Sequence, residues 1–353
     1  MPSEQINLCG LRLPAGPRVI LLVPLLAAVL SACQSLPPAQ STAPLPAVPL
    51  AVAEPPPPPP PPAPEALPPR ALRVGLALGG GAARGFAHVG VIKALEARGI
   101  HPDLIVGTSA GSFVGALYAA GYAGPELQKV AMQFEESSIT DWSLPSRGLL
   151  KGQALQDFIN REVGQRPIEK LPRKLAIVAT DLSSGNMVVF ERGNVGMAVR
   201  ASSSVPGVFQ PVSINGREYV DGGLVSPVPV RVARRLGADV VIAVDISRSP
   251  SSQSTAGALD ILLQTFTIMG QVIARTELEG ADIVLRPSLA AVGSTDFAAR
   301  ESSILEGEQA VLSNGANIDA ALNRAREALA AAAQALGPPA GSPPALPSPP
   351  SVQ

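Results

Sequence analysis

Short apolar runs alternate with helical patterns through the middle of the chain. The run Leu72–Leu78 shows little polar alternation, which is typical of a strand buried on both faces of a sheet. A glycine-rich loop follows, then a helical pattern over Phe86–Arg98 that Gly99 closes. A second apolar run, Leu104–Val106, leads through a tight turn into a helix that ends near Ala120. This order predicts an α/β fold with a mainly parallel central sheet between two helical layers.

The same patterns continue to about residue 337. They predict further strands at Lys174–Ala179, Met187–Phe190, Val240–Val244 and Asp282–Leu285, and helices at Pro125–Glu135, Gly152–Val163, Pro229–Leu236, Leu259–Glu277 and Ala316–Ala335. We assign residues 71–250 to the main domain and 251–337 to a mostly helical C-terminal extension of the same globule.

The proline distribution separates this globule from its two ends. Of 38 prolines, 20 precede Ala71 and 7 follow Gly337. Residues 33–70 therefore form a tether, in which Pro55–Pro62 adopts a stiff polyproline II conformation, and 338–353 form a disordered tail. A spacer is the preferred role of the tether, and a PxxP ligand for a partner protein is the alternative.

Residues 1–32 have the pattern of an export signal. Arg12 and Arg18 precede an apolar run, Val19–Ala32, whose 14 residues are fewer than the roughly 20 of a spanning helix. The sequence Leu30-Ser31-Ala32-Cys33 resembles the lipobox of bacterial lipoproteins, which implies acylation of Cys33 and anchoring in a membrane. Gln34 after this cysteine favours the outer membrane of a bacterial cell envelope. The alternative is an ordinary signal peptide with a chance cysteine.

The composition excludes several classes of protein. The net charge is −1, with 27 basic and 28 acidic residues, so nothing indicates nucleic-acid binding. Two cysteines, Cys9 and Cys33, provide neither a disulfide framework nor a cysteine zinc site. Two histidines, His88 and His101, make a histidine-rich metal centre unexpected. We therefore predict no metal and no cofactor.

The first candidate site residue lies in Gly107-Thr108-Ser109-Ala110-Gly111, which is a GxSxG sequence between a strand and a helix. Such a turn is so tight that the serine adopts a strained backbone and both flanking positions need glycine. It presents the Ser109 hydroxyl at a helix N-terminus, where the helix dipole favours developing negative charge. Ser109 is the predicted nucleophile.

The loop Gly79–Gly85 allows two interpretations. A dinucleotide-binding loop needs the spacing G-x-G-x-x-G and an acidic residue at the end of the next strand. Here Arg84 occupies the position of the third glycine, and Asp103 precedes the next strand. The favoured interpretation is an oxyanion hole built from backbone N–H groups, since this loop and the serine turn both follow neighbouring strands at one sheet edge.

The predicted base is a carboxylate. No histidine follows Ser109, His101 precedes the strand that ends at the serine, and His88 is expected to be a surface or packing residue of a helix. Asp181, Asp221 and Asp245 all come at strand ends. Asp221 precedes Gly222 and Gly223, which allow the backbone to approach another loop closely, so it is the strongest candidate. The other two are expected to cap loops.

Together these segments resemble the patatin-like phospholipases. The resemblance rests on the glycine loop Gly79–Gly85, the serine turn and Asp221-Gly222-Gly223, and extends through Ala179-Thr180-Asp181, Arg200–Phe209 and Tyr219–Pro229, over about residues 73–245. It implies a three-layer α/β/α fold and a dyad of Ser109 as nucleophile and Asp221 as proton acceptor.

The resemblance also assigns the supporting residues. The oxyanion hole would be formed by Gly79, Gly80, Gly81 and Ala82, with Ala82 standing where many members carry a fourth glycine. Motif support would come from Arg84, Gly85, Gly107, Gly111, Gly222 and Gly223, and Arg84 would fix the loop or meet anionic groups.

The expected activity is hydrolysis of fatty acyl esters in membrane lipids or other acyl esters, without a cofactor. The alternative is a non-catalytic, membrane-anchored lipoprotein that uses the fold as a binding or assembly module. The intact serine, aspartate and glycine loop favour the enzyme.

Overall fold

The computed structural model describes residues 70–143, 147–249 and 256–335, which all belong to one compact unit, Pro62–Gln353. The predicted signal segment, the lipobox with Cys33, most of the tether and the C-terminal tail lie outside the described residues.

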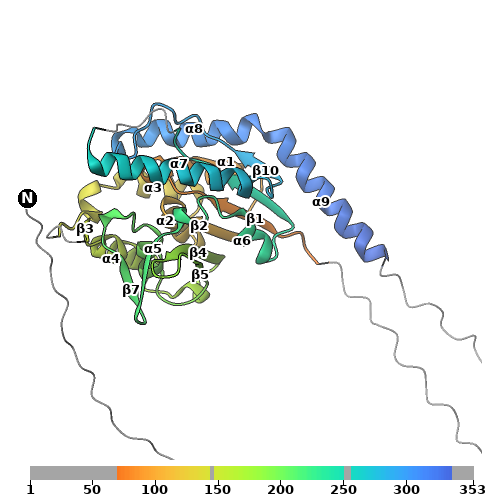
Figure 1. Ribbon diagram of the computed structural model, residues 1–353. Coiled ribbons are helices and arrows are strands. Elements are labelled where there is room, and N and C mark those ends of the chain that lie inside the picture. Colours follow the sequence, from red (N-terminus) through yellow and green to blue (C-terminus); the bar gives the residue numbers. More distant parts are fainter. Residues whose placement is uncertain (1–69, 144–146, 250–255, 336–353) are drawn as a thin grey trace, which may run out of the picture. The chain divides into compact units, whose positions relative to one another are not determined.

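A central sheet runs through this unit (Figure 1). Its strand order is β10-β9-β1-β2-β4-β8-β7, and β5 also pairs with β4. The parallel strands are β1 Val74–Leu78, β2 Leu104–Thr108, β4 Lys174–Asp181, β9 Val240–Val244 and β10 Ile283–Leu285. The antiparallel strands are β5 Met187–Phe190, β7 Val212–Ile214 and β8 Arg217–Asp221. A separate pair joins β3 Gly148–Leu150 to β6 Gly207–Phe209.

Helices cover both faces of the sheet. One core cluster joins the sheet to α1 Phe86–Ala97, α2 Ala110–Ala119, α3 Gly124–Gln133, α4 Gln153–Glu162, α5 Val195–Ser202, α8 Arg300–Ser313 and α9 Gly315–Ala335. The second cluster joins it to α6 Val230–Arg235 and α7 Ala258–Leu278. Successive side chains of β1 alternate between them, since Leu76 and Leu78 enter the first and Ala77 enters the second. The predicted α/β/α fold is confirmed.

Two helices, α5 and α8, and the short strands β3, β6 and β7 were not predicted. The predicted strand near residue 283 is present as β10, and it pairs with β9 at one end of the sheet. The C-terminal segment therefore contributes a strand as well as helices to the described unit. None of the helices in the described residues is both long and apolar enough to cross a bilayer.

Candidate active site

The sheet register brings the ends of β2 and β8 together. Strand β4 pairs with β2 as far as Thr108 opposite Val178, and its next residue, Ala179, pairs with Asp221 of β8. Because β5 occupies the other edge of β4 over the same stretch, β2 and β8 must share one edge. They meet there end to end, so Ser109, which follows β2, lies beside Asp221, which ends β8.

Ser109 occupies a strained turn. Its backbone has φ 52° and ψ −121°, and α2 begins at the next residue, Ala110. A Cβ atom on Gly107 would lie 2.5 Å from the carbonyl oxygen of Gly111, and one on Gly111 would lie 2.1 Å from the carbonyl oxygen of Leu78. The predicted need for glycine on both sides of the serine is confirmed, and part of it comes from the neighbouring strand β1.

Ser202 fixes this turn from α5. Its hydroxyl donates to the carbonyl oxygen of Val178 and accepts from the Ser109 N–H at 2.9 Å. Ser112 donates to the carbonyl oxygen of Ser109 at 2.7 Å. Ser202 belongs to the segment on which the family resemblance rests, but its role was not predicted, because only the folded sheet places it next to Ser109.

The carboxylate of Asp221 is buried, with 1% of the residue exposed. Oδ1 accepts from the Gly223 N–H at 2.7 Å, whereas Oδ2 has no hydrogen-bond partner among the described residues. A Cβ atom on Gly222 would lie 2.3 Å from the carbonyl oxygen of Val178, so the glycine that follows the aspartate allows the predicted close approach.

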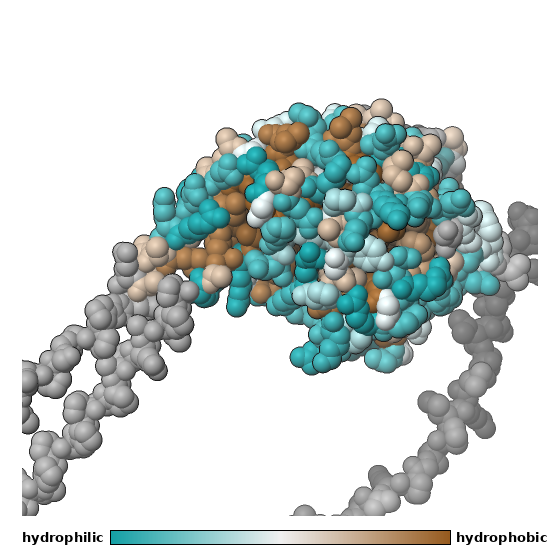
Figure 2. Space-filling view, turned by 180° about the vertical axis from the view of Figure 1, so that it is seen from behind, coloured by the Kyte–Doolittle hydropathy of each residue, from teal (hydrophilic) through white to brown (hydrophobic). Residues whose placement is uncertain are grey.

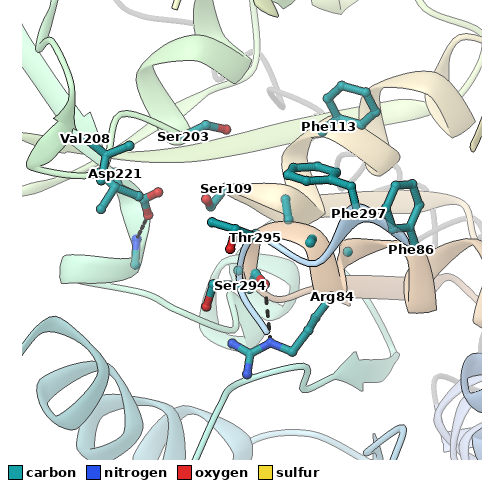
Figure 3. A pocket seen from close by; sticks show the side chains of 18 of the residues that line it. Arg84, Phe86, Ser109, Phe113, Ser203, Val208, Asp221, Ser294, Thr295 and Phe297 are labelled. Carbon is teal, nitrogen blue, oxygen red and sulfur yellow. Dashed lines mark hydrogen bonds between the residues drawn. The ribbon is translucent and has the colours of Figure 1, made fainter. Parts of the chain in front are cut away.

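Burial raises the pKa of Asp221 to about 6, and the Gly223 N–H and the Ser109 hydroxyl offset part of that rise. Figure 3 shows the Asp221 carboxylate and the Ser109 hydroxyl directed toward each other across the pocket. The hydroxyl approaches the carboxylate without forming a hydrogen bond of normal geometry, as is common in active sites without substrate. The two predicted dyad residues are therefore neighbours.

The backbone N–H groups that the glycine loop leaves free for an oxyanion are not all those that were predicted. The Gly79 N–H donates to the carbonyl oxygen of Val244 at 3.1 Å, and the Gly80 N–H donates to that of Pro227 at 3.0 Å. Both are already bonded, so their assignment to an oxyanion hole does not fit the structure. Among the described residues, the N–H groups of Gly81 and Ala82 have no such partner. Gly80 instead lies close to Ser109, since a Cβ atom on Gly80 would be 3.2 Å from that of Ser109.

Ala82 has φ 51°, which is strained for a residue with a side chain. We expect Ala82→Gly to raise the free energy of unfolding by about 1 kcal/mol, because glycine adopts positive φ at little cost. Ala83→Gly is the matched control, because Ala83 is buried and has no positive φ, and it should lower the free energy of unfolding. Urea unfolding measures both, and a destabilised Ala82→Gly protein would contradict the argument.

Two buried side chains hold the glycine loop through its carbonyl oxygens. The buried Arg84 donates from Nε to the carbonyl oxygen of Gly81 at 3.3 Å (Figure 3). Its pKa is lowered to about 10, mainly by burial and also by Arg248. His88 is fully buried, and its Nε2 lies 2.8 Å from the carbonyl oxygen of Gly79. Burial lowers the pKa of His88 to about 4, so its neutral imidazole donates to this carbonyl and it is a packing residue.

The other candidate bases have structural roles. His101 is exposed and precedes β2, at the opposite end of that strand from Ser109. Asp181 accepts from the N–H groups of Ser183 and Ser184, and Asp245 accepts from that of Ser247, so both cap loops as predicted. In the described part of the chain, no group of three or more His, Cys, Asp or Glu side chains is arranged to hold a metal ion.

A pocket of about 580 Å³ opens over Ser109 and Asp221. This volume is in the range of ligand sites in proteins. Phe86, Phe113, Phe134 and Phe297 line one side of it and pack edge-on or tilted against one another, with Phe134 at 5.5–6.4 Å from the other three rings. Few aromatic residues exist in the chain, and this concentration gives the pocket an apolar wall beside the serine.

Residues 76–234 match the family model of the patatin-like phospholipases. This segment therefore resembles a patatin-like phospholipase domain. It contains the serine turn, the whole glycine loop, Asp221 and the apolar wall except Phe297. The extension that follows it supplies α7, β10, α8 and α9.

Curated relatives that match this part of the chain include bacterial, human and fungal proteins. An uncharacterised NTE family protein of Mycobacterium tuberculosis is 41% identical over 180 residues, which is 50% of each chain. Human patatin-like phospholipase domain-containing protein 6 is 36% identical over 193 residues, covering 52% of this chain and 14% of the relative. Lysophospholipase NTE1 of Meyerozyma guilliermondii is 37% identical over 179 residues, covering 49% and 12%. The chain thus spans half, or much less, of these relatives.

Among solved structures, VipD of Legionella pneumophila aligns with 69% of this chain and 66% of its own, at 13% identity and a TM-score of 0.46.

Proposed function

We propose that this chain is a serine hydrolase that cleaves fatty acyl esters of lipids, with Ser109 as nucleophile and Asp221 as proton acceptor. One observation carries the proposal: the strained serine faces a buried carboxylate in an apolar pocket. Among the described residues, neither Oδ2 of that carboxylate nor the N–H groups of Gly81 and Ala82 have a hydrogen-bond partner. The names of two relatives, a lysophospholipase and a patatin-like phospholipase domain-containing protein, support lipid esters as the substrate class.

In the proposed reaction, Oγ of Ser109 attacks the ester carbonyl carbon while Asp221 takes the hydroxyl proton. The N–H groups of Gly81 and Ala82 and the N-terminus of α2 stabilise the developing oxyanion. The proton passes from Asp221 to the departing alcohol, and the acyl group remains on Ser109. Water then attacks this acyl-enzyme, with Asp221 again as base, and releases the fatty acid.

A carboxylate with an ordinary pKa would be a weak base for a serine hydroxyl. Burial changes this, because a pKa of about 6 brings Asp221 closer to the operating pH while leaving it ionised above that value. The apolar wall of phenylalanines is suited to a fatty acyl chain, which gains roughly 0.8 kcal/mol for each buried CH₂ group.

The competing role is a binding or assembly module without catalysis, and the reaction of Ser109 with a fluorophosphonate probe separates the two. We expect labelling of wild-type protein to accelerate about tenfold per pH unit up to about pH 6 and then to level off, because only ionised Asp221 accepts the proton. Ser109→Ala should not be labelled, and Asp221→Asn should react slowly with a flat pH profile. Equal labelling of wild-type protein and Ser109→Ala would refute the proposal.

The proposal also includes a lipid anchor. Cys33 ends a lipobox-like sequence, so the hydrolase would be tethered to the bacterial outer membrane through residues 33–70. The mass of the N-terminal peptide, with or without acyl groups on Cys33, tests this part independently of catalysis.

A further inference from the structure

Helix α7 has an unusual distribution of hydrophobic side chains. A surface helix of a soluble domain normally directs polar residues to solvent. On α7, six large hydrophobic residues are 37–61% exposed: Leu259, Ile261, Leu262, Ile268, Met269 and Val272. Ile261 and Ile268, like Leu262 and Met269, are seven residues apart, and Val272 lies one turn beyond Ile268, so these five residues share one stripe along the helix. From Ile261 to Val272 the sequence contains no charged residue.

The other side of the same helix lines the pocket. Leu263, Phe266 and Thr267 face the cavity, as do Gly270 and Gln271 in the next turn. Phe266 also reaches the loop that follows Asp221, where a Cβ atom on Gly223 would lie 3.0 Å from the Phe266 ring. One helix therefore separates the pocket over Ser109 from the exposed apolar stripe.

The C-terminal end of α7 is firmly anchored. Glu277 is buried, and its two carboxylate oxygens accept from the Ser226 hydroxyl and the Val228 N–H. Ala274 and Leu278 enter the second core cluster. The first four turns contain no fully buried residue, so the exposed stripe belongs to the part of the helix that contacts the rest of the fold least.

The stripe continues onto neighbouring strands. A Cβ atom on Gly207 of β6 would lie 3.1 Å from Leu259 and 3.2 Å from Leu262. Strand β6 pairs with β3, whose Leu149 is 36% exposed, and Trp142, bridged to the adjacent Leu150, is 71% exposed. Leu150 also lines the pocket. We call Trp142, Leu149 and the six residues of α7 the apolar rim.

We propose that the apolar rim docks on an electrically neutral phospholipid bilayer and places the pocket mouth against it. An apolar helical face with an exposed tryptophan beside it is typical of segments that lie in the bilayer interface. Because the apolar rim adjoins the pocket that would receive a lipid, we take a lipid surface as its occupant. The stripe from Ile261 to Val272 has no charged residue, which indicates insertion without attraction to anionic headgroups. The opposite side of the unit, viewed in Figure 2, is largely hydrophilic with hydrophobic areas interrupted by polar residues. This inference rests on the proposed lipid substrate.

Trp142 is the only tryptophan of the chain and reports on docking directly. We expect its emission in the full-length protein to shift to the blue on addition of phosphatidylcholine vesicles, and to be quenched when the acyl chains are brominated. An N-terminal anchor alone would leave Trp142 in water, so this signal separates docking of the rim from tethering. Unchanged emission would overturn the proposal. A blue shift that grows with protein concentration without vesicles would overturn it in favour of a second copy of the chain.

The test variant is the triple substitution Ile261→Asp/Ile268→Asp/Val272→Asp. The control variant is Leu312→Asp on α8, because Leu312 is 61% exposed and belongs neither to the apolar rim nor to the pocket. The triple variant should lose quenching and lower the hydrolysis of phosphatidylcholine vesicles at least about tenfold, because three apolar side chains no longer enter the bilayer. Its hydrolysis of a soluble short-chain ester should be unchanged, as should all properties of Leu312→Asp.

These readouts distinguish the two proposals. Ester hydrolysis without quenching would overturn only the docking surface. Quenching without any ester hydrolysis would overturn the proposed catalysis and leave the docking surface intact. A triple variant that is quenched like the wild type would show that the stripe is not inserted.

Discussion

Replacement of Ser109 by alanine should lower kcat for a short-chain ester by about 10⁴-fold or more, because it removes the atom that is proposed to attack the carbonyl carbon. Asp221→Asn should lower kcat by about 10²–10⁴-fold. An asparagine oxygen can still accept from the Gly223 N–H, so the loop is retained, but an amide cannot take up the serine proton. Both variants are compared with the wild type above pH 7, where Asp221 of the wild-type protein is ionised.

The controls for this experiment come from the same pocket. Ser203 also lines it, and Ser203→Ala should keep activity within a few-fold of the wild type. Circular dichroism and thermal unfolding establish that the inactive variants are folded. Activity of purified Ser109→Ala within tenfold of the wild type would refute the nucleophile assignment, and full activity of Asp221→Asn would refute the base.

Gly90→Ala should lower the free energy of unfolding by more than about 4 kcal/mol or prevent folding. A Cβ atom there would lie 1.8 Å from the carbonyl oxygen of Ile304, because α1 and α8 cross in direct backbone contact. Gly307 on α8 has the reciprocal contact, 2.0 Å from the carbonyl oxygen of Ala87. The new methyl group can be accommodated only if two packed helices separate, which opens the first core cluster.

The same substitution at Gly270 is the matched control. Gly270 is also inside a helix, but a Cβ atom there would meet only the carbonyl oxygen of Gly223, at 3.8 Å. Gly270→Ala should therefore leave the free energy of unfolding unchanged or raise it by about 0.5–1 kcal/mol, since glycine inside a helix is destabilising. Chemical denaturation measures both variants. Similar stabilities for Gly90→Ala and Gly270→Ala would contradict the proposed crossing.

The sequence predicted the elements that carry large hydrophobic residues. Strands β1, β2 and β9 and helices α1 and α2 appear near their predicted positions. Helix α8 was not predicted, because its buried positions include Ser303, Gly307 and Ala310, small residues that leave little hydrophobic periodicity. Their small size is what permits the close crossing with α1.

In the candidate site, too, some features could be predicted from the sequence and others could not. The closeness of Ser109 and Asp221 was predictable because each occupies a motif with local glycine requirements, whereas their catalytic roles stay a prediction. The bonded state of Gly79 and Gly80 was not predictable, since their acceptors, the carbonyl oxygens of Val244 and Pro227, come from segments far along the chain. The contribution of Ser202 likewise depends on how α5 packs against β4.

Burial of the Asp221 carboxylate lowers the free energy of unfolding when this group is ionised. The pKa of its carboxyl is about 6 in the folded chain against 3.8 for an exposed aspartate, so the folded state binds the proton more tightly. Stability from this group is fully present below about pH 4 and is lost as the pH rises through about 6, by an amount on the order of 3 kcal/mol. In the proposed mechanism, catalytic competence would be gained over the same pH interval. The protonation state that would activate the serine is therefore the one that the fold tolerates least.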